Sequence, residues 1–224
     1  MARAKVPGAA PDVTPEYWDE ACRHLVKRDR VMKKLIPQFG EARLKLRSDP
    51  FTTLARSVIG QQISVKSAQA MWERFLALTT TPGSRILPAA VLAQPVEALR
   101  AIGLAARKTE YVRDLARHFE EGNVHVKQWA QMEDEAIVEE LVAIRGIGRW
   151  TADMFLIFHL MRPNVLPLED PNLIQGISEN YFSGEPVSRA EARELGEAWA
   201  PYRSVATWYI WRSLDPVQPL PAEK

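Results

Sequence analysis

Apolar positions recur at spacings of three and four residues through most of the chain, and this pattern predicts a helical protein. The first stripe, Trp18, Ala21, Cys22 and Leu25, follows a start signal at Thr14-Pro15. Residues 124–126 are expected to be briefly extended, without partners for a sheet. Further helices are predicted at residues 30–36, from Asp49-Pro50 to 59, from the Ser64 cap to 76, around 107–121, at 133–144, at 150–160, from 171 to 177, from the Ser188 cap to 199, and from Pro201 onward. The expected fold class is therefore all-α.

Composition adds little to this picture. The 224 residues, 46% of them hydrophobic, can bury one sizeable core or two small ones. Residues 1–13 and the Pro-rich end at 216–221 are expected to be tails. No stretch approaches the length of a membrane span and residues 1–11 lack a secretory signal, so we expect no membrane partner and a cytoplasmic address, at the nucleoid if the source is bacterial.

Cysteine and histidine usage predicts no cofactor and no metal site. The single Cys22 leaves neither an intrachain disulfide nor a four-cysteine iron–sulfur cluster. The histidines lack metal-ligand spacing; they are His24, His118, His125 and His159.

The formal net charge of +1 does not indicate a nucleic-acid partner, but the charge is unevenly distributed. Basic residues dominate residues 23–47, and they form either a solvated face or a phosphate contact. Arg107 and Lys108, early in a later predicted helix, leave the same two interpretations open.

The stretch from residue 141 to 170 carries the most specific pattern. Gly146 and Gly148 flank Ile147 between two predicted helices, where glycine allows a tight turn and a close approach. Amides freed at such a turn, beside a new helix N-terminus, form an anion site, and Arg145 and Arg149 bracket it with positive charge. We call residues 145–149 the hairpin and expect it to bind phosphate.

The helix after the hairpin is apolar on nearly every face, so it belongs in a core. Pro163 cannot continue this helix, and the chain leads to Glu169-Asp170 at a new helix start, Pro171. An Asp before a Pro at the first helical position is most often only a helix cap.

Hairpin, buried helix, loop and Asp together resemble the helix-hairpin-helix DNA glycosylase superfamily, and within it the 3-methyladenine DNA glycosylase II family in a short form without the N-terminal β domain. VIGQQISVKSA at 58–68 and PYRSVATWYIW at 201–211 also match, so the resemblance runs from about residue 49 to 211. It implies two helical lobes on either side of a cleft that receives DNA. Residues 49–142 would form the middle lobe, and residues 1–48 with 143–224 the lobe that contains the hairpin and the catalytic Asp.

The resemblance implies base excision, with double-stranded DNA as partner and a monomeric enzyme. Asp170 would stabilise the positive charge that builds on the sugar and orient the attacking water, with Glu169 as the competing candidate. In the family, the loop at residues 61–63 fills the hole left by the flipped base, which assigns that role to Gln62 beside Gln61 and Ile63. Gln62 departs from the apolar wedge of the best-known pattern, and the alternative is a polar loop packed on its own helix ends.

Trp150 and Trp211 match the family's base-pocket aromatics, with core tryptophans as the alternative. Met154 and Pro171 stand where the best-characterised bacterial relatives have tyrosines, and Trp208 could compensate. Relatives that also cut the strand carry a lysine at the position of Trp150, so the resemblance implies a monofunctional enzyme. The competing hypothesis is a noncatalytic helix-hairpin-helix module that binds DNA and senses damage, with Asp170 only a cap.

Overall fold

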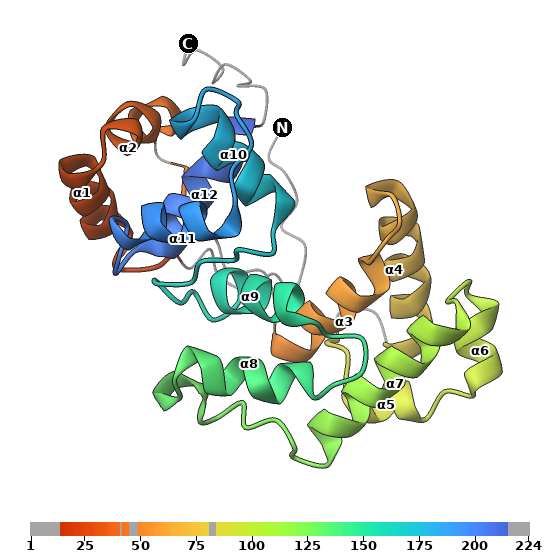
Figure 1. The fold of residues 1–224 in the computed structure, drawn as a ribbon. Helices are drawn as coiled ribbons and strands as arrows, with labels where there is room; N and C mark the ends of the chain where they lie inside the picture. Colours follow the sequence, from red (N-terminus) through yellow and green to blue (C-terminus); the bar gives the residue numbers. More distant parts are fainter. Residues whose placement is uncertain (1–13, 41, 45–48, 81–83, 215–224) are drawn as a thin grey trace, which may run out of the picture. The chain divides into compact units, whose positions relative to one another are not determined.

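The computed structural model describes residues 14–40, 42–44, 49–80 and 84–214, and the expected tails at 1–13 and 216–221 lie outside them. Within these ranges every regular element is a helix, which confirms the all-α prediction (Figure 1). The helices are α1 (Trp18–Arg28), α2 (Arg30–Leu35), η1 (Ile36–Phe39), α3 (Pro50–Gly60), α4 (Val65–Thr79), α5 (Pro88–Leu92), α6 (Val96–Ala101), α7 (Ala106–Glu120), η2 (Trp129–Gln131), α8 (Asp134–Val142), α9 (Arg149–Phe158), α10 (Pro171–Tyr181), α11 (Arg189–Glu197) and α12 (Arg203–Leu214).

Side-chain caps start several helices where the sequence predicts them. Asp49, Ser64, Asp170 and Ser188 each accept a hydrogen bond from a first-turn amide of α3, α4, α10 and α11. Such caps satisfy amides that have no partner within the helix.

Three local expectations differ from the structure. Helix α1 begins at Trp18, because Thr14-Pro15 is followed by a turn in which the Trp18 amide donates to the carbonyl of Pro15. Helix α12 begins at Arg203, two residues after the predicted start at Pro201. Residues 124–126 form no strand but lie in turns and bends before η2.

The chain packs as two compact units. The central unit contains residues 49–160, and the terminal unit contains residues 14–44 and 161–214. None of the described helices is long and apolar enough to cross a membrane.

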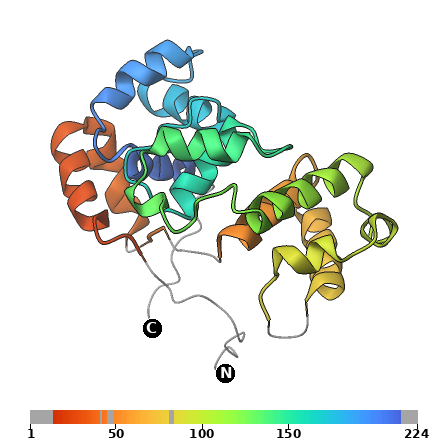
Figure 2. The same cartoon turned by 90° about the horizontal axis from the view of Figure 1, so that it is seen from below.

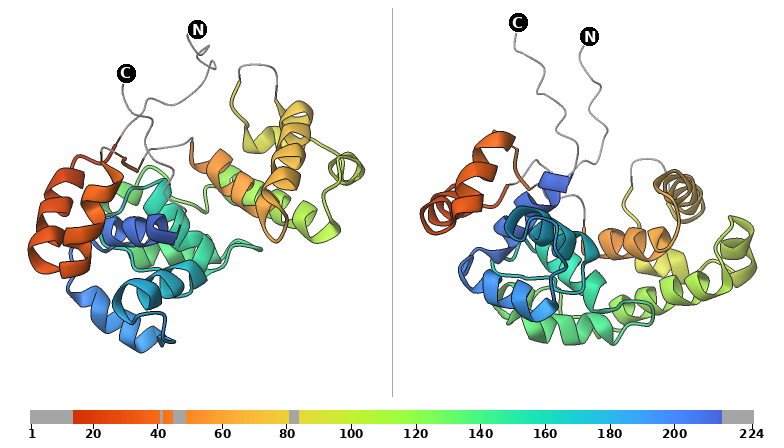
Figure 3. Two further views of the ribbon diagram at one scale, coloured as in Figure 1. Left: turned by 90° about the horizontal axis from the view of Figure 1, so that it is seen from above. Right: turned by 45° about the horizontal axis from the view of Figure 1, so that its top comes forward.

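In the central unit, α3 packs against α4, α7 and α9, and α7 also packs on α5. Figure 3 shows α3 beside both α4 and α7. The buried side chains of α3 and α7, including Leu54, Val58, Val112 and Leu115, form this core.

In the terminal unit, helices from both ends of the chain share one core. Helix α12 packs against α1, α2 and α10, and Figure 2 shows it beside the helices of residues 18–35. Trp18 lies edge-on to Trp208, with 5.2 Å between the ring centroids. The buried carboxylate of Asp29 caps α2 and accepts hydrogen bonds from the Tyr181 hydroxyl and the Trp199 indole.

The two compact units divide after residue 160, whereas the family resemblance implies a middle lobe that ends at residue 142. The hairpin and α9 lie in the central unit because α9 packs against α8 and α3. Phe155, Leu156 and Ile157 of α9 are buried.

Candidate functional site

The hairpin is a tight turn that only glycine fits at its centre. Gly146 has φ +87°, in the left-handed region, and a Cβ on this residue would lie 2.3–2.9 Å from atoms of Tyr111. The buried carboxylate of Asp114 accepts a hydrogen bond from the Arg145 amide at 3.0 Å. Tyr111 and Asp114 of α7 fix the turn, and no local pattern in the sequence marks them for this role.

The N-terminus of α9 is open at the end of the hairpin. Gly148 is the N-cap and supplies no side-chain hydrogen bond to the first amides of the helix. A Cβ built on Gly148 meets no atom within 4 Å, so the space above its backbone is open. Helix N-termini carry partial positive charge and unsatisfied amides, so this end suits a phosphate group.

The two arginines of the hairpin are paired with acids. Arg145 donates to Glu110 at 3.1 Å, while Arg149 donates to Glu135 at 2.6 Å and to the buried Asp153 at 2.9 Å. Burial disfavours the charged guanidinium, but its hydrogen bonds to the two carboxylates and their negative charge outweigh burial and raise the pKa of Arg149. The positive charge expected from the sequence is thus largely compensated, which leaves the backbone amides as the main anion-binding groups.

The loop between α3 and α4 is exposed at its tip and tied at its base. Gln62 has φ +55° and an exposed side chain, and Ile63 is 39% exposed. The side-chain amide of Gln61 donates to the Gly146 carbonyl at 3.0 Å, so Gln61 links this loop to the hairpin. The side chain of Gln61 thus contacts the hairpin rather than the ends of its own helices, and the side chain of Gln62 is exposed.

Lys108 of α7 contacts the same loop. Its ammonium group donates to the carbonyls of Ile59 and Gln61, both at 2.7 Å. The sequence offered a phosphate contact or a solvated face for this lysine, and in the structure its ammonium group is bonded to the end of α3. A cavity of about 530 Å³ is lined by residues of the loop, of the start of α7 and of the hairpin.

In the terminal unit, Asp170 holds a defined position at the start of α10. Its Oδ1 accepts hydrogen bonds from the Leu173 amide at 2.7 Å and from the Trp211 indole at 2.8 Å. Asp170 is 3% exposed, whereas its neighbour Glu169 is exposed. Between these two carboxylates, the structure therefore orients only Asp170 in a surrounding that excludes water.

Close packing and a loop anchor position this carboxylate. Gly176 of α10 lets the helix approach α12, since a Cβ there would lie 2.4 Å from the side chain of Ile210. The Ser204 hydroxyl of α12 accepts from the Val165 amide and donates to the Arg162 carbonyl, which holds the loop before Asp170. Gly176 and Ser204 were not found from the sequence.

The predicted pocket residues divide between the two units. Trp150 is 40% exposed and Met154 half-buried, both on α9 of the central unit. In the terminal unit, Trp211 is half-buried and Pro171 is exposed at the first position of α10. Trp208 is buried and packs against Trp18 and Tyr209 in the core of the terminal unit.

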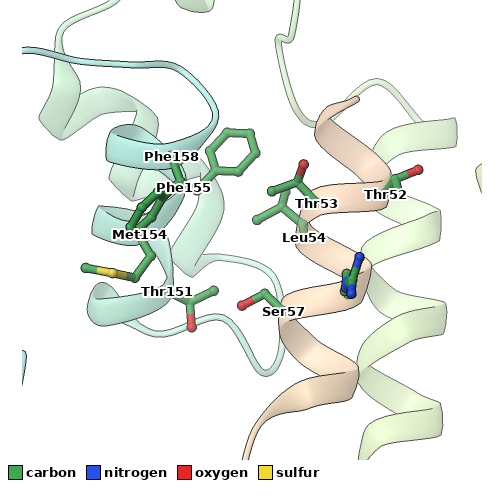
Figure 4. A pocket seen from close by; sticks show the side chains of 9 residues that line it. Thr52, Thr53, Leu54, Ser57, Thr151, Met154, Phe155 and Phe158 are labelled. Atoms are coloured by element: carbon green, nitrogen blue, oxygen red, sulfur yellow. The ribbon is translucent and has the colours of Figure 1, made fainter. Parts of the chain in front are cut away.

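Met154 lines a cavity of about 390 Å³ within the central unit, between α3 and α9 (Figure 4). Phe158 also lines it from α9, and Thr53 and Ser57 line it from α3, with the Ser57 hydroxyl pointing toward α9. No group of three histidine, cysteine, aspartate or glutamate side chains suited to a metal ion occurs in the part of the chain that the structure describes.

Comparison with known families identifies the chain. The family profile described as "HhH-GPD superfamily base excision DNA repair protein" matches residues 55–201. The chain belongs to the HhH-GPD superfamily. This confirms the resemblance inferred from the hairpin and Asp170.

Named relatives extend over nearly the whole chain. It is 30% identical over 194 residues to "DNA-3-methyladenine glycosylase 1" of Schizosaccharomyces pombe, covering 85% of each chain. A crystal structure of a DNA-3-methyladenine glycosidase from Bacillus halodurans superposes with a TM-score of 0.80 and 35% identity over 86% of this chain and 88% of that one. The structure of the S. pombe 3-methyladenine DNA glycosylase Mag1 in complex with abasic DNA superposes with a TM-score of 0.76 and 29% identity. The match covers 87% of this chain and 96% of that one.

Proposed function

We propose that this protein is a monofunctional DNA glycosylase that flips alkylated bases, of the 3-methyladenine type, out of double-stranded DNA and hydrolyses their N-glycosidic bonds. The observation that carries the proposal is the carboxylate of Asp170, which is buried and oriented by two N–H donors on one oxygen. The resemblance assigns the catalytic role to the same residue. The relatives with matching names, which cover most of this chain, support the same reaction class.

The reaction needs one fixed anion. As the bond between the sugar C1′ and the base nitrogen breaks, its electron pair leaves with the base and positive charge develops on the deoxyribose. The carboxylate of Asp170 stabilises that charge and directs a water molecule to C1′, taking up its proton. A site that excludes water strengthens the electrostatic effect.

A base made cationic by alkylation is a good leaving group, because the bonding electron pair neutralises it. Such a cation also stacks favourably on indole rings. We assign Trp150, Trp211, Met154 and Pro171 to its recognition. Trp150 follows Gly148-Arg149 where strand-cutting relatives have a lysine, so no amine is supplied there for a Schiff base.

Binding to DNA is assigned to two elements of the central unit. The hairpin at residues 145–149 holds a phosphate through the backbone amides at the open N-terminus of α9, where Gly148 is the N-cap. Gln62 enters the duplex and occupies the space of the extruded base, with Ile63 beside it. We propose that the protein carries out the reaction as a monomer.

A noncatalytic DNA-binding module is the second candidate, and one observation favours it. The hydrogen bond from the Leu173 amide to Asp170 is the bond of an ordinary helix cap. If capping were the only role of Asp170, the hairpin would suffice for binding to damaged DNA.

The variant Asp170→Asn separates these candidates, because Asn caps a helix as well as Asp does but carries no charge. Wild type and variant are incubated with DNA that contains 3-methyladenine or 7-methylguanine, and the released base is quantified. We expect release by wild type and a loss of about 100-fold or more in the variant. No release by wild type supports the binding module, and equal release by both proteins removes Asp170 from the mechanism. Thermal unfolding of both proteins checks that the cap is retained.

A further inference from the structure

The loop that presents Gln62 is held by a lysine from another helix. Lys108 donates to the carbonyls of Ile59 and Gln61, so one ammonium group binds both sides of the point where α3 ends. The carbonyls at the end of a helix have no partners within it and carry partial negative charge. An ammonium group donates hydrogen bonds to these carbonyls, and its positive charge balances their partial negative charge.

The position of Lys108 within its own helix makes this contact more informative. Lys108 lies in the first turn of α7, where the positive end of the helix dipole disfavours a cation. Burial also lowers the pKa of the Lys108 ammonium group. Two costs are therefore borne at this residue, and the contacts with the end of α3 offset them.

The next residue along the loop needs such support. Gln62 has φ +55°, a left-handed backbone conformation that is unfavourable for a residue other than glycine. Gln61 is held twice, by Lys108 at its carbonyl and by the Gly146 carbonyl at its side chain. The loop base is thus fixed to α7 on one side and to the hairpin on the other, while the tip projects outward.

We infer that Lys108 is a positioning residue for base flipping, which holds the loop at residues 61–63 so that Gln62 is already arranged to occupy the vacated space. This inference rests on the proposed function, since only a base-flipping enzyme needs the plug. A side chain fixed before binding loses less conformational entropy when it enters the duplex. Lys108 acts through Gln61 and touches neither the base nor the sugar.

The test compares two DNA duplexes in single-turnover release assays. Each carries one 7-methylguanine, opposite cytosine in the first duplex and opposite a tetrahydrofuran abasic analogue in the second. Lys108→Met should slow release from the first duplex about 10- to 100-fold, because it removes the hydrogen bonds that the charged ammonium group donates to the loop. It should slow release from the second less than about threefold, because extrusion there breaks no base pair and leaves no orphaned base.

Three comparisons keep the result specific. Lys108→Arg retains a cationic donor and should recover part of the rate. Lys127→Met makes the same substitution at an exposed lysine of the central unit and should match wild type. Hydrogen exchange of the amides at residues 61–65 should be faster in Lys108→Met than in Lys127→Met, without any dependence on catalysis.

Equal losses on both duplexes would overturn the inference, because they would indicate a general defect in folding or chemistry. An unchanged rate on the first duplex would overturn it as well. If wild type releases no base, the proposed function fails, and hydrogen exchange alone decides whether Lys108 holds the loop. Unchanged exchange in Lys108→Met would then contradict that role.

Discussion

The indole Nε1 of Trp211 donates a hydrogen bond to Oδ1 of Asp170 at 2.8 Å, across 41 residues of sequence. The same oxygen accepts the Leu173 amide, so the carboxylate is oriented by one donor from its own helix and one from α12. Trp211 therefore has two separable properties in the proposed reaction, an aromatic face and an N–H group aimed at the anion.

The variant Trp211→Phe tests the N–H group while it keeps an aromatic ring. We expect base release under single-turnover conditions to fall roughly 10- to 100-fold, the range for one hydrogen bond to a charged group. The variant disturbs the orientation of the Asp170 carboxylate and leaves the binding of DNA largely intact. The rate at saturating enzyme should therefore fall more than the affinity for DNA. A fall in affinity with an unchanged rate would assign Trp211 to stacking alone.

A second prediction concerns Gly146 and the stability of the hairpin. Gly146→Ala places a side chain at φ +87° and within 2.9 Å of Tyr111, so both backbone strain and a steric clash oppose it. We expect the free energy of unfolding to fall by about 2 kcal/mol or more. Urea denaturation measures this change, and a loss under about 0.5 kcal/mol would show that the turn rearranges at little cost.

The matching substitution at Gly148 should affect binding instead of stability. Gly148 has φ −97°, and a Cβ there meets no protein atom, so Gly148→Ala should leave the free energy of unfolding within about 0.5 kcal/mol of wild type. A phosphate held at the N-terminus of α9 would meet the new methyl group. We expect the Kd for DNA to rise about tenfold or more in a fluorescence anisotropy titration at fixed salt. An unchanged Kd would show that no phosphate of the DNA binds next to Gly148.

The sequence predicts those parts of the site whose determinants are local. The Asp-Pro pair at 170–171 predicts a helix start and a capping carboxylate, and the structure has both. The contact with Trp211 depends on the close approach of α10 and α12, which Gly176 allows through its lack of a side chain against Ile210. No spacing within either helix contains that information.

Charge at the hairpin illustrates the same limit. Arg145 and Arg149 indicate an anion site when the sequence is read locally. Their partners, Glu110 and Glu135, lie 35 and 14 residues away, so the pairing becomes visible only after α7 and α8 are in place. Lys108 shows the opposite case, because local rules disfavour a cation in the first turn of α7 and only the end of α3 explains it.

A further prediction follows from Glu140 of α8, which accepts hydrogen bonds from the Trp129 indole and from His125. Burial would raise the pKa of this carboxyl, but these bonds outweigh it, and the pKa is lowered. A carboxyl with a lowered pKa in the folded state contributes stability above its unfolded pKa, about 4.3, and loses that contribution as the pH falls through the folded value.

The variant Glu140→Gln should therefore be less stable than wild type at pH 6, and the difference should shrink as the pH falls below about 4. Urea denaturation across this range measures it. Glu139→Gln, at an exposed neighbouring position, serves as the control and should show a small difference at every pH. A Glu140→Gln difference independent of pH would assign the loss to packing.

The last prediction concerns Trp150, at the position where strand-cutting relatives have a lysine. Trp150→Lys supplies an amine, yet we expect no strand cleavage and no covalent adduct trapped by borohydride. Trp150 is 40% exposed, and a lysine at an exposed site remains protonated near its ordinary pKa of about 10.4, so it is a poor nucleophile. Attack on C1′ also requires the amine to be held in line with the breaking bond, and four rotatable carbons on an exposed turn of α9 do not provide that. The contrary result would be a borohydride-trapped complex that this variant forms and that the double variant with Asp170→Asn does not. It would show that the site already positions an amine at residue 150 for attack on C1′.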